Sequence, residues 1–268
     1  MAESKSGKIY VGIGGWTFEP WRGTFYPDKL SQKRELEYAS QRLTSIEING
    51  TYYGSQKPES FRKWHDETPE DFVFSLKGPR FATNRKELAQ SKESVERFLA
   101  SGILELKDKL GPINWQFMET KKFEPEDFAA FLAFLPPSVE GRKLRHVVEV
   151  RNDSFAAPDF VDLARKHKVA VVTAGDSRFP QIADITADFV YLRILGTVEE
   201  NEKGYTDAEL DAWAERARTY ASGKVPDDLK CVSDKAAKAA PRDVFLYVIS
   251  GHKERNPAAA MALIERLS

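Results

Sequence analysis

The stretch RHVVEVRNDSF, residues 145–155, holds the features that decide the fold. Its apolar part, HVVEV at 146–150, has the composition of a buried strand, yet the segment also carries two charges. Because side chains alternate along a strand, Val147, Glu149 and Arg151 share one face. A charged group removed from water costs several kcal/mol unless it is paired. Either the pair is neutralised within the core, or this face opens into a site that uses charge.

Seven further apolar runs occur along the chain, and helical patterns separate them. This alternation is typical of repeated βα units around a parallel sheet. The runs are KIYVGIGG (8–15), SIEINGTYY (45–53), FVFSLKG (72–78), PINWQFM (112–118), VAVVTAGD (169–176), FVYLRILG (189–196) and VFLYVIS (244–250). A chain of 268 residues is close to the roughly 250 residues of a typical eight-stranded barrel. The sequence therefore predicts an α/β fold, a TIM-type (β/α)8 barrel.

Three of the intervening helices are well marked. Thr206 and Glu209 have the form of a capping box, and Asn256 followed by Pro257 is a good helix start. The third helix has one apolar face, made of Phe128, Phe131, Leu132 and Leu135. A doubly wound dinucleotide fold would also alternate strands and helices, but it requires G-x-G-x-x-G after the first strand. GIGGWTF has Thr17 at the position of the last glycine, so this alternative lacks its fingerprint.

We expect a single domain over residues 1–268. Residues 1–7 are predicted to form a flexible N-terminus, and 223–242 to form a surface insertion before the last strand. The charge is balanced, with 40 Lys+Arg against 41 Asp+Glu, which favours neither nucleic acid nor a membrane surface as partner. One cysteine, no signal peptide and no apolar run of about 20 residues predict a cytoplasmic protein without a membrane span.

In barrels the chemistry lies at the carboxyl ends of the strands. Polar side chains stand at that end of most predicted strands. As catalytic residues we predict Glu47, Glu149 and Asp176. As ligand-binding residues we predict Asn49, Lys77, Gln116, Arg151, Tyr191, Arg193 and Trp16. A buried ion-pair network is the competing interpretation, but one core rarely requires so many charges.

The residue types indicate what such a site would do. Glu47 and Glu149 are suited to share general acid and base roles, while Lys77, Arg151 and Arg193 suit a phosphate or carboxylate. We expect a solvated cleft, in which replacing Glu149 by Gln costs about 1 kcal/mol, against about 3 to 5 for a buried structural pair. The aromatic segment 16–27 either packs on itself or stacks a sugar or base, and Trp16 is our candidate for stacking.

A metal site has weaker support. Glu47, Glu149, Asp176 and His252 come from separate strands, but the chain has only four histidines. HExxH, P-loop and G-x-S-x-G patterns do not occur in the sequence. We therefore predict no cofactor and no bound metal.

Together these residues resemble the YecE-like family, domain of unknown function 72. The resemblance is carried, over nearly the whole chain, by GIGGW, FYP, EINGTYY, FVFSLKGPR, LGPINWQF, VVEVRNDSF and FVYLRILG. It implies a TIM barrel whose strand-end residues gather in one cleft, and it implies no particular reaction. The family often has Arg-x-His-Gly at the seventh strand, where this chain has Leu195 in place of the histidine. The family also often has Phe-x-Asn-Asn at the eighth strand, where this chain has YVISGHKERNP. Whether His252, in that stretch, replaces the histidine missing at the seventh strand stays open.

Three functions remain. The leading one is an enzyme that acts on a small anionic or carbohydrate-like molecule by acid/base chemistry, as a hydrolase or sugar isomerase does. The alternatives are a nucleic-acid-processing barrel with a metal site and a non-catalytic ligand-binding barrel. The fold by itself does not choose among them, and the oligomeric state stays open.

Overall fold

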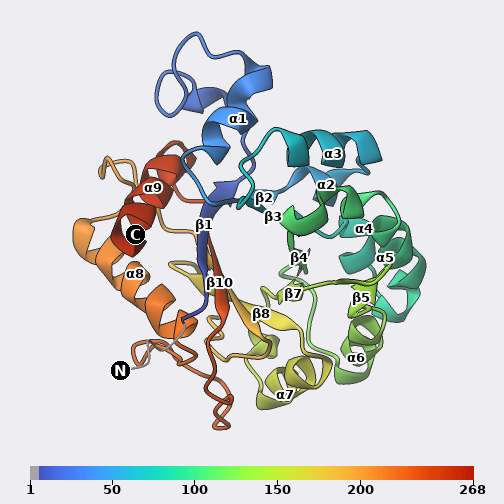
Figure 1. Ribbon diagram of the computed structural model, residues 1–268. Coiled ribbons are helices and arrows are strands. Elements are labelled where there is room, and N and C mark those ends of the chain that lie inside the picture. The colour runs from blue at the N-terminus through green and yellow to red at the C-terminus, as the bar shows by residue number, and fades with distance from the viewer. Residues whose placement is uncertain (1–5) are drawn as a thin grey trace.

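The computed structural model describes residues 6–268 and contains a closed parallel barrel. Around the barrel the strand order is β1-β10-β9-β8-β7-β4-β3-β2, and β1 closes the ring by pairing with both β10 and β2. The barrel strands are β1 (Ile9–Gly14), β2 (Ser45–Ile48), β3 (Val73–Lys77), β4 (Leu110–Gln116), β7 (His146–Glu149), β8 (Ala170–Gly175), β9 (Phe189–Ile194) and β10 (Asp243–Val248). The predicted barrel is thus confirmed. Figure 1 shows the strands in the centre with the helices around them.

The helices cover the outside of the barrel. They are α1 (Glu35–Ser40), α2 (Gly50–Tyr53), α3 (Pro58–Asp66), α4 (Arg80–Thr83), α5 (Lys92–Leu99), α6 (Pro125–Ala133), α7 (Pro158–His167), α8 (Asp207–Ala221) and α9 (Asn256–Leu267). The capping box predicted at Thr206 and Glu209 is present at the start of α8. The helix predicted to start at Asn256 is α9. A two-stranded hairpin, β5 (Ser138–Val139) with β6 (Arg142–Lys143), precedes β7.

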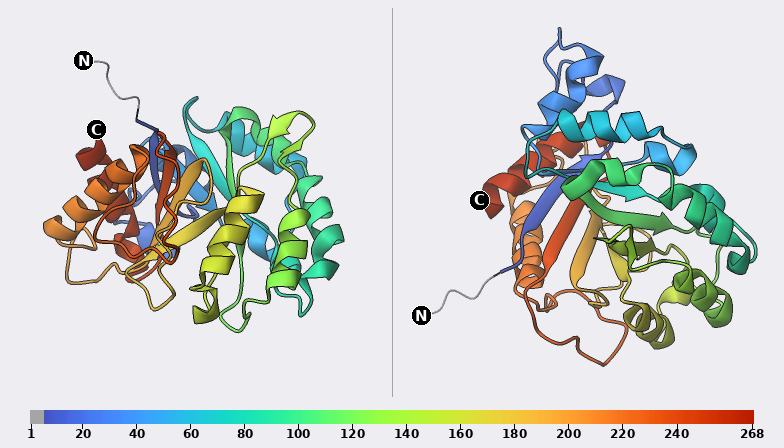
Figure 2. Two further views of the ribbon diagram at one scale, coloured as in Figure 1. Left: turned by 90° about the horizontal axis from the view of Figure 1, so that it is seen from below. Right: turned by 45° about the vertical axis from the view of Figure 1, so that its right-hand side comes forward.

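One βα unit departs from the regular pattern. No helix lies between β8 and β9 in the described chain, and residues 176–188 form an irregular segment instead. The stretch 223–242 contains no strand and passes outside the barrel, where it is drawn in orange at the bottom of the right-hand view of Figure 2. Asp184 joins the two segments, because its buried carboxylate accepts hydrogen bonds from the backbone N–H groups of Val232 (2.7 Å) and Ser233 (3.1 Å).

The stretch predicted to be flexible at the N-terminus is only partly described. Residues 1–5 lie outside the described residues. The backbone N–H of Gly7 donates to the carbonyl of Ala221 at 3.0 Å, just before β1 begins.

The barrel interior is built in layers. Val73, Val147, Val172, Phe189 and Phe245 belong to a separate apolar cluster that fills the barrel at the level of the amino ends of the strands. Because side chains alternate, the next inward position on each strand lies closer to the carboxyl end. There the residues are polar, and they include Ser45, Ser75, Tyr191 and Tyr247, all of them fully buried. Apolar side chains on the other face of each strand pack against the helices. The interior therefore changes from apolar to charged along the barrel axis.

We expect Asp184→Ala to destabilise the protein by about 2 kcal/mol, because two buried backbone N–H groups lose a charged acceptor. The matched control is Asp227→Ala, which removes an exposed carboxylate from the same 223–242 stretch and should change stability little. Urea unfolding measures both variants, and hydrogen exchange should show faster exchange at residues 231–235 in the first only. Equal midpoints for the two variants would contradict the role assigned to Asp184.

Candidate functional site

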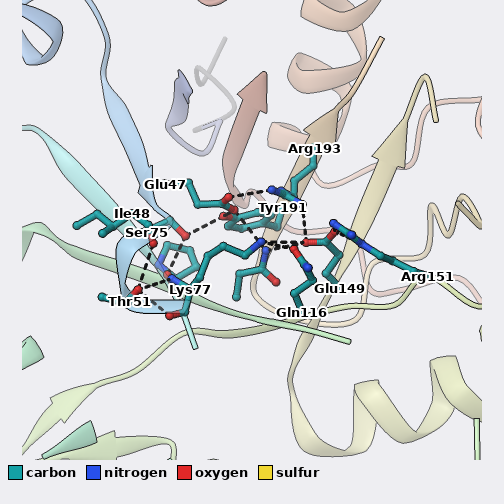
Figure 3. A network of polar contacts seen from close by, with 12 residues as sticks. Glu47, Ile48, Thr51, Ser75, Lys77, Gln116, Glu149, Arg151, Tyr191 and Arg193 are labelled. Atoms are coloured by element: carbon teal, nitrogen blue, oxygen red, sulfur yellow. Dashed lines mark hydrogen bonds and ion pairs between the residues drawn. The ribbon is translucent and has the colours of Figure 1, made fainter. Parts of the chain in front are cut away.

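Five charged side chains meet at the carboxyl end of the barrel, and we call them the charged cluster. Four strands and one following loop supply them, and Figure 3 shows them pointing toward one another. The members are Glu47 at β2, Lys77 at β3, Glu149 at β7, Arg151 just after β7 and Arg193 at β9. Sequence patterning placed each of them on the inner face, and the structure brings all five together.

Arg193 connects the two carboxylates of the cluster. Its Nη2 donates to Glu47 Oε1 at 2.9 Å, and its Nη1 donates to Glu149 Oε2 at 2.6 Å. Asn114 lies between the same two groups, since its Nδ2 donates to Glu149 Oε2 at 3.1 Å and to Glu47 Oε2 at 3.3 Å. Tyr191 completes the environment of Glu47, donating from its hydroxyl to Oε2 at 2.6 Å. Glu47 is thus enclosed by protein donors and is 0% exposed.

Glu149 is surrounded by cations. Arg151 donates to its Oε1 from Nε at 2.9 Å and from Nη2 at 2.6 Å, and Arg193 binds the other oxygen. Burial raises the pKa of Glu149, but Arg193, Lys77 and Arg151 together lower the pKa well below its ordinary value. The carboxylate is therefore ionised at neutral pH. It is only 3% exposed, so the prediction that it faces a solvated cleft is wrong, because protein groups occupy the positions that water would have.

Lys77 has an unusual environment for a lysine. Its side chain is 6% exposed, its Nζ donates to Gln116 Oε1, and Glu149 Oε2 is 4.0 Å away. The Tyr52 ring lies beneath the ammonium, with its centroid at 5.2 Å. Burial and the nearby Arg193 lower the pKa of Lys77 to about 8, although Glu149 opposes the change. Both protonation states of Lys77 are therefore accessible near neutral pH.

Arg151 is the outermost member of the cluster, with a side chain that is 23% exposed. It stacks on Phe179 at 4.6 Å from the ring centroid, and its described hydrogen bonds use Nε and Nη2. Its Nη1 is therefore the donor of the cluster best placed to meet a ligand. Gln116 is half-buried beside Lys77 and also lies at this level.

The structure does not bring two predicted site residues to the cluster. Asp176 is exposed, and its Oδ2 accepts a hydrogen bond from Trp213 Nε1 of α8 at 2.8 Å, which makes it a contact between loop and helix. The Trp16 ring packs edge-on against Trp64 of α3 (5.3 Å) and Phe74 (6.5 Å), on the outer face of β3. The sequence predicts Trp16 as a ligand-stacking residue, but the ring fills space between strand and helix.

Two further predicted residues contribute differently from expectation. Tyr191 is fully buried beneath Glu47 and donates a hydrogen bond to it, so Tyr191 positions that carboxylate. Burial and the nearby Glu47 raise the pKa of the Tyr191 hydroxyl well above its ordinary value, so the hydroxyl stays protonated and remains a donor. Asn49 is half-buried at the start of α2, and its amide lies over Gly14, where a Cβ would come within 2.8 Å of Nδ2. Asn49 thus stands at the ends of β1 and β2, beside the cluster.

Sequence reasoning missed Asn114, although a signal for it was present. It lies on the same face of β4 as Gln116, two positions away, so the alternation that selected Gln116 also selects Asn114.

His252 is 30% exposed and its Nε2 lies 3.9 Å from Glu254, and its described contacts do not include the cluster. Within residues 6–268, no group of three or more His, Cys, Asp or Glu side chains is placed to hold a metal ion. Within the same range, no helix has the length and apolarity needed to cross a membrane.

We expect Glu149→Gln to cost about 3 to 5 kcal/mol of stability, because it leaves the buried Lys77 and Arg193 and the partly buried Arg151 without their shared counter-charge. This value replaces the smaller one that the sequence suggested. Glu119→Gln is the matched control, since Glu119 pairs with Arg178 at the surface and should contribute about 0 to 1 kcal/mol. Urea unfolding at pH 7 measures both, and similar costs for the two variants would show that Glu149 is not held as described.

The chain is similar in sequence to two curated bacterial proteins. A 149-residue stretch, 56% of this chain, is 30% identical to the UPF0759 protein YecE of Escherichia coli (strain K12) and covers 50% of it. A 159-residue stretch is 24% identical to the UPF0759 protein YunF of Bacillus subtilis (strain 168) and covers 54% of it. The chain thus matches about half the length of these curated relatives.

Likeness in structure extends further along the chain. A crystal structure of a DUF72 family protein from Thermotoga maritima matches 96% of this chain and 97% of its own, with a TM-score of 0.71 and 23% identity. At this identity the likeness concerns the fold. The family described as "Protein of unknown function DUF72" matches residues 10–268, which includes every member of the charged cluster. The chain therefore belongs to the DUF72 family.

Proposed function

We propose that this protein is an enzyme that acts on a small anionic, carbohydrate-like molecule by acid/base chemistry at the carboxyl end of the barrel. One observation carries the proposal. The charged cluster contains Lys77, Arg151 and Arg193 but only two carboxylates, Glu47 and Glu149, in a place where all but Arg151 are nearly buried. With Lys77 protonated, one positive charge has no counter-charge in the cluster, and burial makes that charge costly. An anionic ligand would supply the missing charge.

Arg151 is the residue that would bind the anion. It is the most exposed member of the cluster, its guanidinium stacks on Phe179, and Nη1 has no described partner beside the two donors that bind Glu149. An arginine held in this way loses little side-chain entropy when it binds a carboxylate or phosphate. Gln116, the last residue of β4, and Asn49, which follows β2, are half-buried amides suited to hydroxyl groups of a carbohydrate-like ligand.

Lys77 takes the acid/base role in this proposal, in place of the two glutamates. Glu149 is ionised and bound by two arginines, so it is a poor base, and Glu47 is fully enclosed by protein donors. A lysine with a pKa of about 8 exchanges protons near neutral pH, which is the property that general acid/base catalysis requires. Glu47 and Glu149 then act as positioning residues, holding Arg193 and stabilising the charged form of Lys77.

The test combines binding with turnover. Sugar phosphates, sugar acids and their neutral counterparts would be screened by thermal shift, and each binder would be followed by NMR for conversion. We expect the anionic compounds alone to raise the melting temperature and at least one to be converted. Binding without conversion would favour a non-catalytic ligand-binding barrel. Binding of short DNA with no small-molecule binder would favour the nucleic-acid alternative.

We expect Arg151→Met to weaken binding of an anionic ligand by about tenfold to a hundredfold, the effect of losing one or two charged hydrogen bonds. Arg178→Met is the matched control, because Arg178 stacks on the same Phe179 ring but pairs with the exposed Glu119. Calorimetric titration measures both variants. Equal loss of affinity in the two would assign the effect to general surface charge.

Binding of the anion should weaken as pH rises through about 8, because Lys77 then loses the charge that the anion pairs with. A bound anion also raises the pKa of Lys77. Calorimetric titration in two buffers of different ionisation enthalpy measures the protons taken up on binding. We expect little uptake below pH 8 and uptake approaching one proton near pH 9. An affinity that is flat between pH 6 and pH 10 would argue against Lys77 as the titrating group.

Lys77→Met should make the protein more stable at pH 7, because the charged lysine is disfavoured in the folded state relative to water. The pKa of Lys77 is about 8 in the folded protein, against an ordinary value of 10.5 for lysine. Between these two pH values the unfolded chain holds a proton that the folded protein has released, so wild-type stability rises with pH relative to the variant. Urea unfolding from pH 7 to pH 10.5 should show the advantage of the variant shrinking across this window, and a constant difference would contradict the account.

A further inference from the structure

We propose that Lys77 is a nucleophile that forms a covalent imine with its ligand, and that the ligand is therefore a small anionic aldehyde or ketone. This inference rests on the proposed function, because it concerns the same anion site, but it names a bond that acid/base chemistry does not require.

Comparison with a second buried lysine shows what is unusual about Lys77. Lys109 is 5% exposed, close to the 4% of Lys77. Its Nζ donates to the carbonyls of His65 (2.6 Å) and Thr68 (2.7 Å) and lies 3.2 Å from Thr68 Oγ1, so its three donors have acceptors and its ammonium is a structural group. Lys77 has one described hydrogen bond, to the neutral amide of Gln116. Its nearest carboxylate oxygen is 4.0 Å away and already binds Arg193.

An amine in this position is prepared for attack on a carbonyl carbon. The free base has a lone pair, and a lysine that is desolvated beside other cations reaches that form more easily than an exposed one. Burial and Arg193 lower the pKa of Lys77 to about 8, in agreement with this environment. The Gln116 amide is uncharged, so a ligand oxygen can take its place as the partner of Nζ without leaving a new charge unpaired.

The floor of the site contains two unpaired polar atoms. Asn114 Oδ1 and Arg193 Nε are buried, and no described protein atom forms a hydrogen bond with either. Asn114 is the register partner of Lys77 in the β3–β4 pairing. Asn114 Oδ1 can accept a hydrogen bond and Arg193 Nε can donate one, and the hydroxyl of a carbinolamine both donates and accepts hydrogen bonds.

The reaction balances without a further reagent. The amine nitrogen of Lys77 forms a bond to the carbonyl carbon, and the carbonyl oxygen becomes the hydroxyl of a carbinolamine. The C–O bond then breaks and the oxygen leaves as water, so that a protonated amine and a carbonyl compound give an iminium ion and one water molecule. The positive charge stays on nitrogen. Glu149, ionised and close to Nζ, stabilises the iminium as it stabilises the ammonium, so the charge balance of the cluster is preserved.

Reductive trapping tests the inference. The protein would be incubated with pyruvate, glyoxylate or dihydroxyacetone phosphate and sodium borohydride, then digested and analysed by mass spectrometry. We expect one secondary-amine adduct per chain, on the peptide that contains Lys77, with saturation as the probe concentration rises. Its rate should exceed that of an exposed lysine by about tenfold or more and rise with pH around 8. Lys109 should stay unmodified, and the neutral probe dihydroxyacetone should label Lys77 less than its phosphate does.

Variants and a second ligand separate this inference from the proposed function. Lys77→Arg keeps the charge but lacks a nucleophilic amine, so it should abolish the adduct, whereas Lys109→Arg should leave trapping unchanged. Lactate, an anion without an aldehyde or ketone group, should bind in calorimetry and leave no adduct. If lactate and pyruvate both bind and neither is trapped, the imine is overturned while the anion site stands. Adducts spread over the surface lysines, or no saturable labelling with any carbonyl probe, would also overturn the imine, and absence of all anion binding would overturn both.

Discussion

The carboxyl end of this barrel depends on the bridge that Arg193 makes between Glu47 and Glu149. The two glutamates come from β2 and β7, strands that are not neighbours in the barrel, and each is removed almost fully from water. Two buried carboxylates without a shared cation would repel each other and lack solvation. Arg193 resolves this with one planar group that donates to both. Asn114 repeats the connection, donating to the same oxygen of Glu149 and to the other oxygen of Glu47. The positions of Lys77 and Arg151 follow, because each is oriented by Glu149.

The polar side chains deeper in the barrel are held differently from those of the charged cluster. Lower in the interior, the Ser75 hydroxyl lies within hydrogen-bond distance of the Tyr191 hydroxyl and of the Pro112 carbonyl, and apolar side chains toward the amino ends of the strands fill the rest. In the upper layer, Asn114 Oδ1 and Arg193 Nε are buried without a described hydrogen-bond partner. The other such atoms in the described chain lie in or next to helices, on Glu35, Thr83 and Arg255. Unsatisfied polar atoms in a barrel interior are costly, so the two on Asn114 and Arg193 agree with the proposed ligand site.

The residues predicted for the site fall into two groups, those within a strand and those in the segment that follows it. Glu47, Lys77 and Gln116 point inward by alternation, and the structure finds them where the pattern places them. Asp176 and Trp16 follow their strands in irregular segments, where alternation no longer applies and the backbone turns freely. Asp176 has a positive φ of 51°, and its carboxylate points to Trp213 of α8. A residue just after a strand can therefore face either the mouth of the barrel or a neighbouring helix.

The sequence by itself determined the barrel, because strand and helix patterns are local and eight of the former in this length leave few other ways to bury their apolar faces. It also determined which side chains point into the barrel, since the period of a strand is two residues. Only the tertiary structure decided what those side chains do to one another. The enclosure of Glu47, the crowding of cations at Glu149 and the poorly satisfied ammonium of Lys77 arise from contacts between residues many positions apart in the chain. Such contacts depend on the curvature of a closed sheet and on distances of a few ångströms. A local sequence pattern encodes neither the curvature nor the distances.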